Sequence, residues 1–379
     1  MDSAYHRLRR RLDELPIPFP ESETGVELRL LQALFSREEA EVAVHLSAVP
    51  EPVTAIYRRA APLVENHASL EAMLKELARR GAINAVTEIH RDSSRQCYGL
   101  APLVVGMFEF QVDRLTPEFV RDFHDYADQG FREAVVGTRA AQMRTVPVGA
   151  AITGTRAVGS YDDIRDYVRK SPGPFAVMNC VCRQGAELLG APCRSSSTHE
   201  TCITIGSAAR SMVVSTVSRP VEREEVLEIL NRAEGEGHVL QPQNSRTPGF
   251  ICCCCRDCCE VLRNARRLPH PADAIPTTHR AAVDTGSCTA CGICLKRCPL
   301  EALTPGTLGR SVQVIPGRCI GCGLCVTTCP TRAISLTRRA DAKRPPRTTM
   351  AMYLKILRHR FGLPGLARAG IRRVLRRKI

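Results

Sequence analysis

The sequence predicts an α+β protein of several domains, and three observations carry that prediction. The chain has 379 residues, enough for two or three domains of roughly 150 residues each. Of its 19 cysteines, Cys97 alone precedes residue 180 and none follows residue 329. Fourteen of the 53 Lys and Arg residues, but a single acidic residue, lie from Arg338 onward. The predicted order is therefore a cysteine-poor region, a cysteine-rich centre and a basic tail.

Residues 20–115 predict helices followed by a β-hairpin. The stretch VELRLLQALFSREEAEVAVHLS predicts two helices, and Ser36 with Glu39 forms a capping box for the second. NAVTEIHRDSSRQCYGLAP predicts two strands around a polar turn. Between them, SLEAMLKELARRGAIN predicts an amphipathic helix that ends at Gly81 and buries one face, formed by Leu70, Met73, Leu74 and Leu77.

This order of elements resembles the winged-helix fold. In a DNA-binding protein of that fold, the helix at 69–80 would enter the major groove and the hairpin would act as a wing. A DNA-reading helix needs a basic patch, and this one carries acids and bases together, namely Glu71, Lys75, Glu76, Arg79 and Arg80. A winged-helix interaction or packing module is therefore favoured over a DNA-binding one.

Residues 116–159 predict a connecting helix, at 115–137, and a linker. Residues 160–278 predict an α/β cysteine-rich domain whose first helix spans 160–172. FAVMNCVCR predicts a buried strand with Cys180 and Cys182 on the same face, because side chains alternate along a strand. RQGAELLGAP then predicts a short helix that ends at Gly190.

GFICCCCRDCCEVL places six cysteines in eight positions, 252–259. Its first half predicts an extended segment, in which Cys252 and Cys254 share one face and Cys253 takes the other. A helix beginning near Cys255 would then present the last two cysteines on its face. The two segments could therefore direct many thiolates into one cavity.

Metal binding explains this density of cysteines better than the alternatives. The N-terminus lacks an apolar signal segment, which predicts a cytoplasmic location, where structural disulfides are rare. A role as small buried hydrophobic side chains suits Cys97 and fits Cys193 or Cys253, but not the whole run. Crowded thiolates need a cation, which predicts one or two additional iron–sulfur clusters here, either further 4Fe–4S clusters or one larger or atypical cluster. The predicted ligands are Cys180, Cys182, Cys193, Cys202, Cys252, Cys254, Cys255, Cys258 and Cys259.

The region resembles a group of anaerobe iron–sulfur proteins that pair an N-C-x-C-R block with an I-C-x-C-C…C-C block. The matching residues here are 179–183 and 251–259, ahead of a two-cluster module. Members of that group have Asn at the position of Cys253 and a further Cys near Asp257. The difference implies a ligand that has moved or been replaced by a carboxylate. The resemblance implies extra cluster binding and electron flow.

Residues 279–337 contain two copies of the motif C-x-x-C-x-x-C-x-x-x-C-P, in DTGSCTACGICLKRCPLEAL and PGRCIGCGLCVTTCPTRAI. Four converging thiolates hold a cuboidal 4Fe–4S cluster, so the pair predicts two clusters. A pair of zinc knuckles is the alternative, which the third spacing and both prolines disfavour. The intervening EALTPGTLGRSVQVIPGR predicts a short helix, a turn and a strand.

These motifs resemble the bacterial two-cluster ferredoxin at all eight ligand positions. The resemblance implies that each motif gives three ligands to one cluster and its last cysteine to the other. One cluster would then be held by Cys288, Cys291, Cys294 and Cys329. The other would be held by Cys319, Cys322, Cys325 and Cys298.

Residues 338–379 form a tail that holds nearly all of the net charge of +14. Apolar residues spaced among its arginines predict a basic amphipathic helix, with a disordered tail as the alternative. Such a helix could contact an anionic membrane or an acidic partner. No stretch of the chain approaches the ~18 apolar residues of a membrane span, so that contact would be peripheral, at the inner face of the membrane.

The sequence predicts an iron–sulfur electron-transfer protein that exchanges electrons with an unidentified redox protein. One alternative is an oxidoreductase whose middle-domain metal site binds substrate, and another is a redox-sensing DNA-binding regulator. No hydrolase triad, P-loop or dinucleotide fingerprint is present. Solvated or capping roles, rather than metal ligation, are predicted for His199, Glu200 and His238 because cysteines already suffice.

Overall fold

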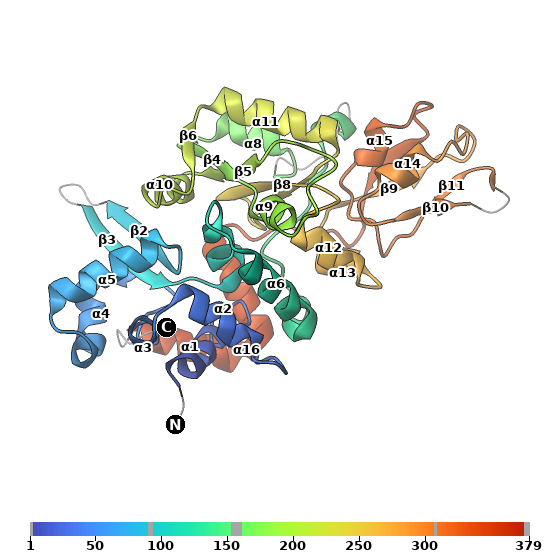
Figure 1. Ribbon diagram of the computed structural model, residues 1–379. Helices are drawn as coiled ribbons and strands as arrows, with labels where there is room; N and C mark the ends of the chain where they lie inside the picture. Colours follow the sequence, from blue (N-terminus) through green and yellow to red (C-terminus); the bar gives the residue numbers. More distant parts are fainter. Residues whose placement is uncertain (1–2, 90–93, 153–160, 307–308, 375–379) are drawn as a thin grey trace. The chain divides into compact units, whose positions relative to one another are not determined.

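A computed structural model describes residues 3–89, 94–152, 161–306 and 309–374 (Figure 1). The chain divides into two compact units. The first comprises residues 1–139, 211–218 and 353–379, and the second comprises residues 140–210 and 219–352. All predicted cluster ligands belong to the second unit.

The first unit begins with five helices, α1 (Ala4–Asp13), α2 (Val26–Leu34), α3 (Arg37–Ala43), α4 (Val53–Ala60) and α5 (His67–Arg79). The predicted capping box is present, with the Ser36 hydroxyl accepting from the Glu39 amide and the Glu39 carboxylate accepting from the Ser36 amide. On α5, the predicted apolar face is buried at Leu70, Leu74 and Leu77 and half-buried at Met73.

The first unit also contains a three-stranded antiparallel sheet, with the order β1-β3-β2, whose first strand precedes α4. Its strands are β1 (Glu51–Pro52), β2 (Ile83–Ile89) and β3 (Ser94–Leu100). The hairpin of β2 and β3 agrees with the prediction, while its turn at 90–93 lies outside the described residues. Cys97 is buried on β3, as predicted for a cysteine without a ligand role. The winged-helix assignment itself stays a prediction.

The helix predicted at 115–137 is two helices, α6 (Pro117–Tyr126) and α7 (Arg132–Gly137). The chain bends between them at Gly130, whose φ of +109° no right-handed helix contains. The α6 helix packs on α2, where Arg29 pairs with Asp122 at 2.7 Å.

The basic tail forms a helix, α16 (Thr349–Val374), that bends at Gly362. In the first unit Arg360 of α16 donates to the Asp13 carbonyl at 2.9 Å and pairs with the Asp13 carboxylate at 2.8 Å. These contacts join the tail to the end of α1. Within the described part of the chain, every helix is too short or too polar to cross a membrane. Contact of the tail with a membrane or an acidic partner stays a prediction.

The second unit contains a five-stranded sheet with the order β6-β4-β5-β8-β7 and antiparallel neighbours throughout. Its strands are β4 (Phe175–Asn179), β5 (Glu200–Ile205), β6 (Arg219–Val221), β7 (Val239–Pro242) and β8 (Phe250–Cys254). Helices α8 (Ile164–Lys170) and α11 (Arg223–Glu236) cover one face of this sheet (Figure 1). The shorter α10 (Ser207–Val214) lies between β5 and β6 in the sequence.

Two boundaries in the cysteine-rich region differ from the prediction. The strand β4 ends at Asn179, and Cys180 caps a helix, α9 (Val181–Leu188), so Cys180 and Cys182 do not lie on one strand face. After β8 the next helix, α12 (Glu260–Arg266), begins with Cys259 as its cap rather than near Cys255. The Cys255 sulfur accepts the Cys258 amide at 3.4 Å, which holds the intervening residues in a turn.

The C-terminal part of the second unit is built from two small antiparallel pairs and two short helices. Strand β9 (His279–Val283) pairs with β12 (Ile334–Arg338), and β10 (Leu303–Pro305) pairs with β11 (Val312–Val314). The helices are α14 (Ile293–Arg297) and α15 (Leu324–Thr327), and α13 (Pro271–Ala274) precedes β9. The helix predicted after Pro299 is absent from the described residues, because Glu301 takes a φ of +54° and the chain turns into β10.

This part of the chain repeats its backbone conformation every 31 residues. Left-handed φ values recur at three pairs of equivalent positions, Ala290 and Gly321, Gly292 and Gly323, and Glu301 and Arg332. The cysteines of the two motifs are offset by the same 31 positions. The repeat gives this region the internal symmetry expected of a ferredoxin-like module, which we call the dicluster module (residues 279–338).

Candidate iron–sulfur centres

Four cysteines of the dicluster module line one pocket of the second unit. They are Cys298, Cys319, Cys322 and Cys325, which we call the buried set, and each is at most 9% exposed. Cys298, the last cysteine of the first motif, therefore lies in the same pocket as the first three cysteines of the second motif. The remaining walls of the pocket are largely apolar.

The other four motif cysteines, Cys288, Cys291, Cys294 and Cys329, form the outer set. Cys291 is exposed, Cys288 and Cys329 are half-buried, and only Cys294 is buried. Burial raises the pKa of Cys294, and the neighbouring Cys291 and Cys288 thiolates raise it further. The outer set therefore borders solvent, whereas the buried set does not.

The donor chemistry of the buried set fits an iron–sulfur cluster. Burial raises the pKa of Cys322 and of Cys325, and the nearby thiolates of the same set add to the rise. Thiolates in such a place need a cationic partner, which the irons of a 4Fe–4S cluster would provide. When bound, the cluster would accept and release one electron at a time.

Gly321 allows the second motif to pass close to the backbone of the strand β9. A Cβ at this position would lie 2.2 Å from the His279 carbonyl oxygen, and its φ is +63°. We expect Gly321→Ala to destabilise the second unit by more than the roughly 1–2 kcal/mol of a left-handed residue. Thermal unfolding and iron content would measure the loss.

Gly309→Ala is the matched control, because Gly309 has a similar φ of +67° and nothing within 4 Å of an added Cβ. The difference between the two variants isolates the steric overlap from the cost of the backbone conformation. Equal stabilities for the two variants would contradict the close approach.

The sheet of the second unit brings the remaining cysteines to one edge. Strands β4 and β8 run in the same direction with β5 antiparallel between them, so both end at the same edge. Cys180 follows the end of β4, and the run Cys254–Cys259 occupies the end of β8 and the turn after it. This topology brings together segments about seventy residues apart in the sequence.

Four of these thiols form a connected group, Cys180, Cys182, Cys254 and Cys259, which we call the thiol quartet. The Cys182 thiol contacts those of Cys180 and Cys259, and the Cys259 thiol also contacts that of Cys254. The hydrogen bond with Cys182, followed by burial, raises the pKa of Cys180 well above its usual value. Without a cation these thiols are therefore neutral.

Three other thiols form a second group, Cys193, Cys255 and Cys258, which we call the thiol triad. Their sulfur atoms all lie within 4.8 Å of one another. Cys255 and Cys258 are buried, while Cys193 is half-buried. A hydrogen bond from the Cys258 thiol, aided by the Cys258 amide, lowers the pKa of Cys255 to about 5 despite its burial.

The last two predicted ligands, Cys202 and Cys252, face each other across β5 and β8 with their sulfurs 3.8 Å apart. Cys253 points the other way on β8 and is 2% exposed within the core of the second unit. Burial raises the pKa of Cys253 to about 12. Cys253 therefore packs as a small apolar side chain, one of the two roles that the sequence left open for it. Cys193, for which a buried apolar role was also considered, lies in the thiol triad instead.

Arg183 lies between the two thiol groups and was not anticipated as a site residue. Its side chain is 1% exposed, donates to the Thr198 carbonyl, and contacts the Cys255 thiol. Its charge also acts on Cys180 and Cys193. The signal in the sequence was an arginine directly after the largely apolar, cysteine-containing segment FAVMNCVC.

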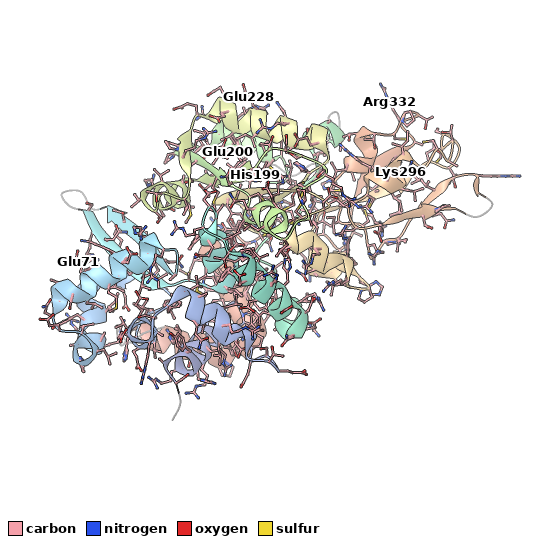
Figure 2. All side chains as sticks on the ribbon, in the orientation of Figure 1. Glu71, His199, Glu200, Glu228, Lys296 and Arg332 are labelled. Atoms are coloured by element: carbon pink, nitrogen blue, oxygen red, sulfur yellow. The ribbon has the colours of Figure 1, made fainter. Side chains whose placement is uncertain are left out.

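His238 is the partner of Arg183 rather than a solvated residue. The Nη2 atom of Arg183 lies 3.1 Å from Nε2 of His238, whose side chain is fully buried. Burial, with the Arg183 charge, lowers the pKa of His238 to about 3, so its imidazole is neutral and can accept this hydrogen bond. His199 and Glu200 lie at the start of β5 (Figure 2), and Glu200 pairs with Arg219 at 2.6 Å.

Comparison with known protein families matches only the C-terminal part of the chain. Two models, each described as a 4Fe–4S dicluster domain, match residues 287–334 and 318–356. These matches cover the motifs of the dicluster module and support a ferredoxin-like iron–sulfur module with an electron-transfer role. No curated protein and no solved structure matches the chain.

Proposed function

We propose that this chain is an electron-transfer protein in which the dicluster module exchanges electrons between an external redox partner and a third 4Fe–4S cluster in the middle domain. The outer set would hold the entry cluster and the buried set the second cluster. The thiol quartet would hold the third. The observation that carries the proposal is the unequal exposure of the two motif sets, since Cys291 is exposed and the whole buried set is not.

Packing inside the second unit supports electron exchange between the dicluster module and the middle domain. Cys322 of the buried set belongs to the same hydrophobic core as Ile251 of β8 and Leu262 of α12. The Cys322 carbonyl accepts the Val148 amide at 2.9 Å. Through Cys322 the buried set therefore shares a hydrophobic core with Cys254 and Cys259 of the thiol quartet.

Arg256 ties the cysteine-rich turn to the dicluster module. This residue directly follows Cys255, donates to the Lys296 carbonyl at 2.9 Å, and approaches the Glu301 carboxylate at 3.3 Å. Lys296 lies on α14, between two cysteines of the first motif. The contact holds the middle-domain thiols at a fixed place relative to the module, which electron transfer over short distances requires.

The test is to purify the full-length protein without oxygen and to measure iron and acid-labile sulfide per chain. Three cubanes give about twelve of each, whereas the dicluster module alone gives about eight. EPR of the stepwise reduced protein should show a third signal in addition to the two of the module. A sulfide content of about eight would leave the dicluster module intact and remove the third cluster from the proposal.

A further inference from the structure

We propose that the thiol triad is a separate site for one divalent metal ion of the zinc or ferrous class, with its fourth coordination position open to solvent. The site is distinct from the cluster proposed for the thiol quartet, and it goes beyond the proposed function because it does not depend on the third cluster. Binding of the ion would release a proton from each thiol that is not already ionised. No electron transfer is needed for the site to form.

The spacing of the sulfur atoms favours a single ion. Four thiolates around one zinc ion at about 2.3 Å lie about 3.8 Å from one another. The three sulfurs of the triad lie within 4.8 Å of one another, which is close to this spacing. The thiol quartet differs, because its contacts run in a chain and, among the described residues, no three of its sulfurs all lie within 4.8 Å of one another. The thiolates of a cubane each bind a different iron atom, so they too are spread around a larger body.

The arrangement of the paired cysteines explains why two sites form. In each of the pairs 254–255 and 258–259, one cysteine belongs to the thiol quartet and the other to the thiol triad. The quartet members are Cys254 and Cys259, which contact each other. The triad members are Cys255 and Cys258, which lie beside Cys193. The sequence C-C-x-x-C-C thus serves two sites from one turn, because neighbouring side chains leave the backbone in different directions.

Among the residues that the structure describes, no further His, Cys, Asp or Glu joins the triad as a fourth ligand. The Asp257 carboxylate, the nearest oxygen donor in the sequence, accepts the Arg194 amide at 3.2 Å and is not within the 4.8 Å group. The Ser195 hydroxyl lies 3.3 Å from the Cys193 sulfur and is another oxygen beside the group. Cys193 is only half-buried, so the triad is accessible to solvent at this cysteine. Three protein ligands and a free position are typical of metal sites that bind an exogenous ligand. A soft anion such as a thiolate or sulfide is the chemical class that would complete the site.

Arg183 supports the coexistence of the two sites. Its guanidinium contacts the Cys255 thiol of the triad and lies near Cys180 of the quartet. Three thiolates with a divalent ion carry a net negative charge, and a thiolate-bound cluster does as well. A buried cation between them reduces their mutual repulsion, which low-polarity surroundings would otherwise strengthen.

The experiment uses the full-length protein purified without oxygen, with zinc, iron and acid-labile sulfide measured per chain. We expect about one metal ion per chain in excess of the iron that sulfide accounts for. Cys258→Ser and Cys193→Ser should each remove this ion and leave the sulfide content unchanged. Cys252→Ser is the matched control, because Cys252 is a half-buried neighbour outside the triad and its loss should leave the ion bound.

Addition of Co²⁺ to protein depleted of the extra ion gives a second readout. Thiolate-to-cobalt absorption should develop with one equivalent of Co²⁺ and should change when a small thiol is added, because the fourth position is open. A variant that retains its sulfide has folded and kept its clusters. If Cys258→Ser does not fold, the ion content of Cys193→Ser alone tests whether the triad binds the ion.

Two outcomes would overturn the proposal. If Cys193→Ser and Cys258→Ser each lose about four irons with their sulfide, the triad belongs to a cluster. If no extra ion is found and a disulfide joins two triad cysteines in the isolated protein, the group is a redox-active dithiol. A sulfide content of about eight with the extra ion retained would instead contradict only the third cluster.

Discussion

Replacing Cys298 with Ser is expected to remove one of the two module clusters, about four irons per chain, and to spare the cluster of its own motif. Cys298 lines the same pocket as Cys319, Cys322 and Cys325, so its loss opens the buried set. Iron and sulfide analysis with EPR would measure which cluster is lost. Cys97→Ala is the control, because Cys97 is buried in the first unit and touches no proposed cluster.

Double variants make this test decisive. If Cys298 serves the buried set, Cys298→Ser with Cys322→Ser should lose no more iron than either change alone. Cys298→Ser with Cys294→Ser should lose both module clusters, about eight irons. The reverse pattern, in which the change at Cys294 adds nothing, would show that each motif binds its own cluster.

The second large effect is expected at Cys254 but not at the adjacent Cys253, and both residues lie on β8. Cys254→Ser should remove the cluster of the thiol quartet, about four irons with their sulfide, because this thiol contacts that of Cys259. Cys253→Val should leave the iron content unchanged, since Cys253 points to the opposite face of β8 from Cys254 and Val preserves its apolar character. Metal analysis of the two anaerobically purified variants gives the comparison.

The iron contents of Cys254→Ser and Cys253→Val can be compared directly, because the two substitutions lie next to each other on the same strand. A loss of iron in both would mean that β8 itself fails to pair, which circular dichroism would reveal. A loss of iron at Cys253→Val with β8 intact would assign Cys253 to the cluster and would overturn the quartet as described.

The dicluster module could be predicted from sequence because its information is local. Ligand spacing, both prolines and the glycines lie within two short motifs, and the family matches cover the same residues. The helices and the hairpin of the first unit also followed from periodicity and capping, as at Ser36. No known structure tests the winged-helix assignment of those elements.

The partition of the middle-domain thiols could not be predicted in the same way. It depends on where β4 ends and where α12 begins, and both boundaries were placed wrongly because strand periodicity does not distinguish Cys180 from a helix cap. Arg183 and His238 were missed because their contact joins residues 55 positions apart. The pairing of β5 with β8, which brings Cys202 to Cys252, is equally non-local.

The two copies of the 31-residue repeat in the dicluster module differ in the substitutions they can accept. The second copy is constrained at Gly321, which the His279 carbonyl closely approaches, while the first copy already accepts a methyl group at the equivalent Ala290. Neither copy is solvent-facing as a whole, because Cys298 of the first motif lies in the buried set and Cys329 of the second motif lies in the outer set. Substitutions are therefore tolerated position by position, as at residue 290, rather than across a whole copy.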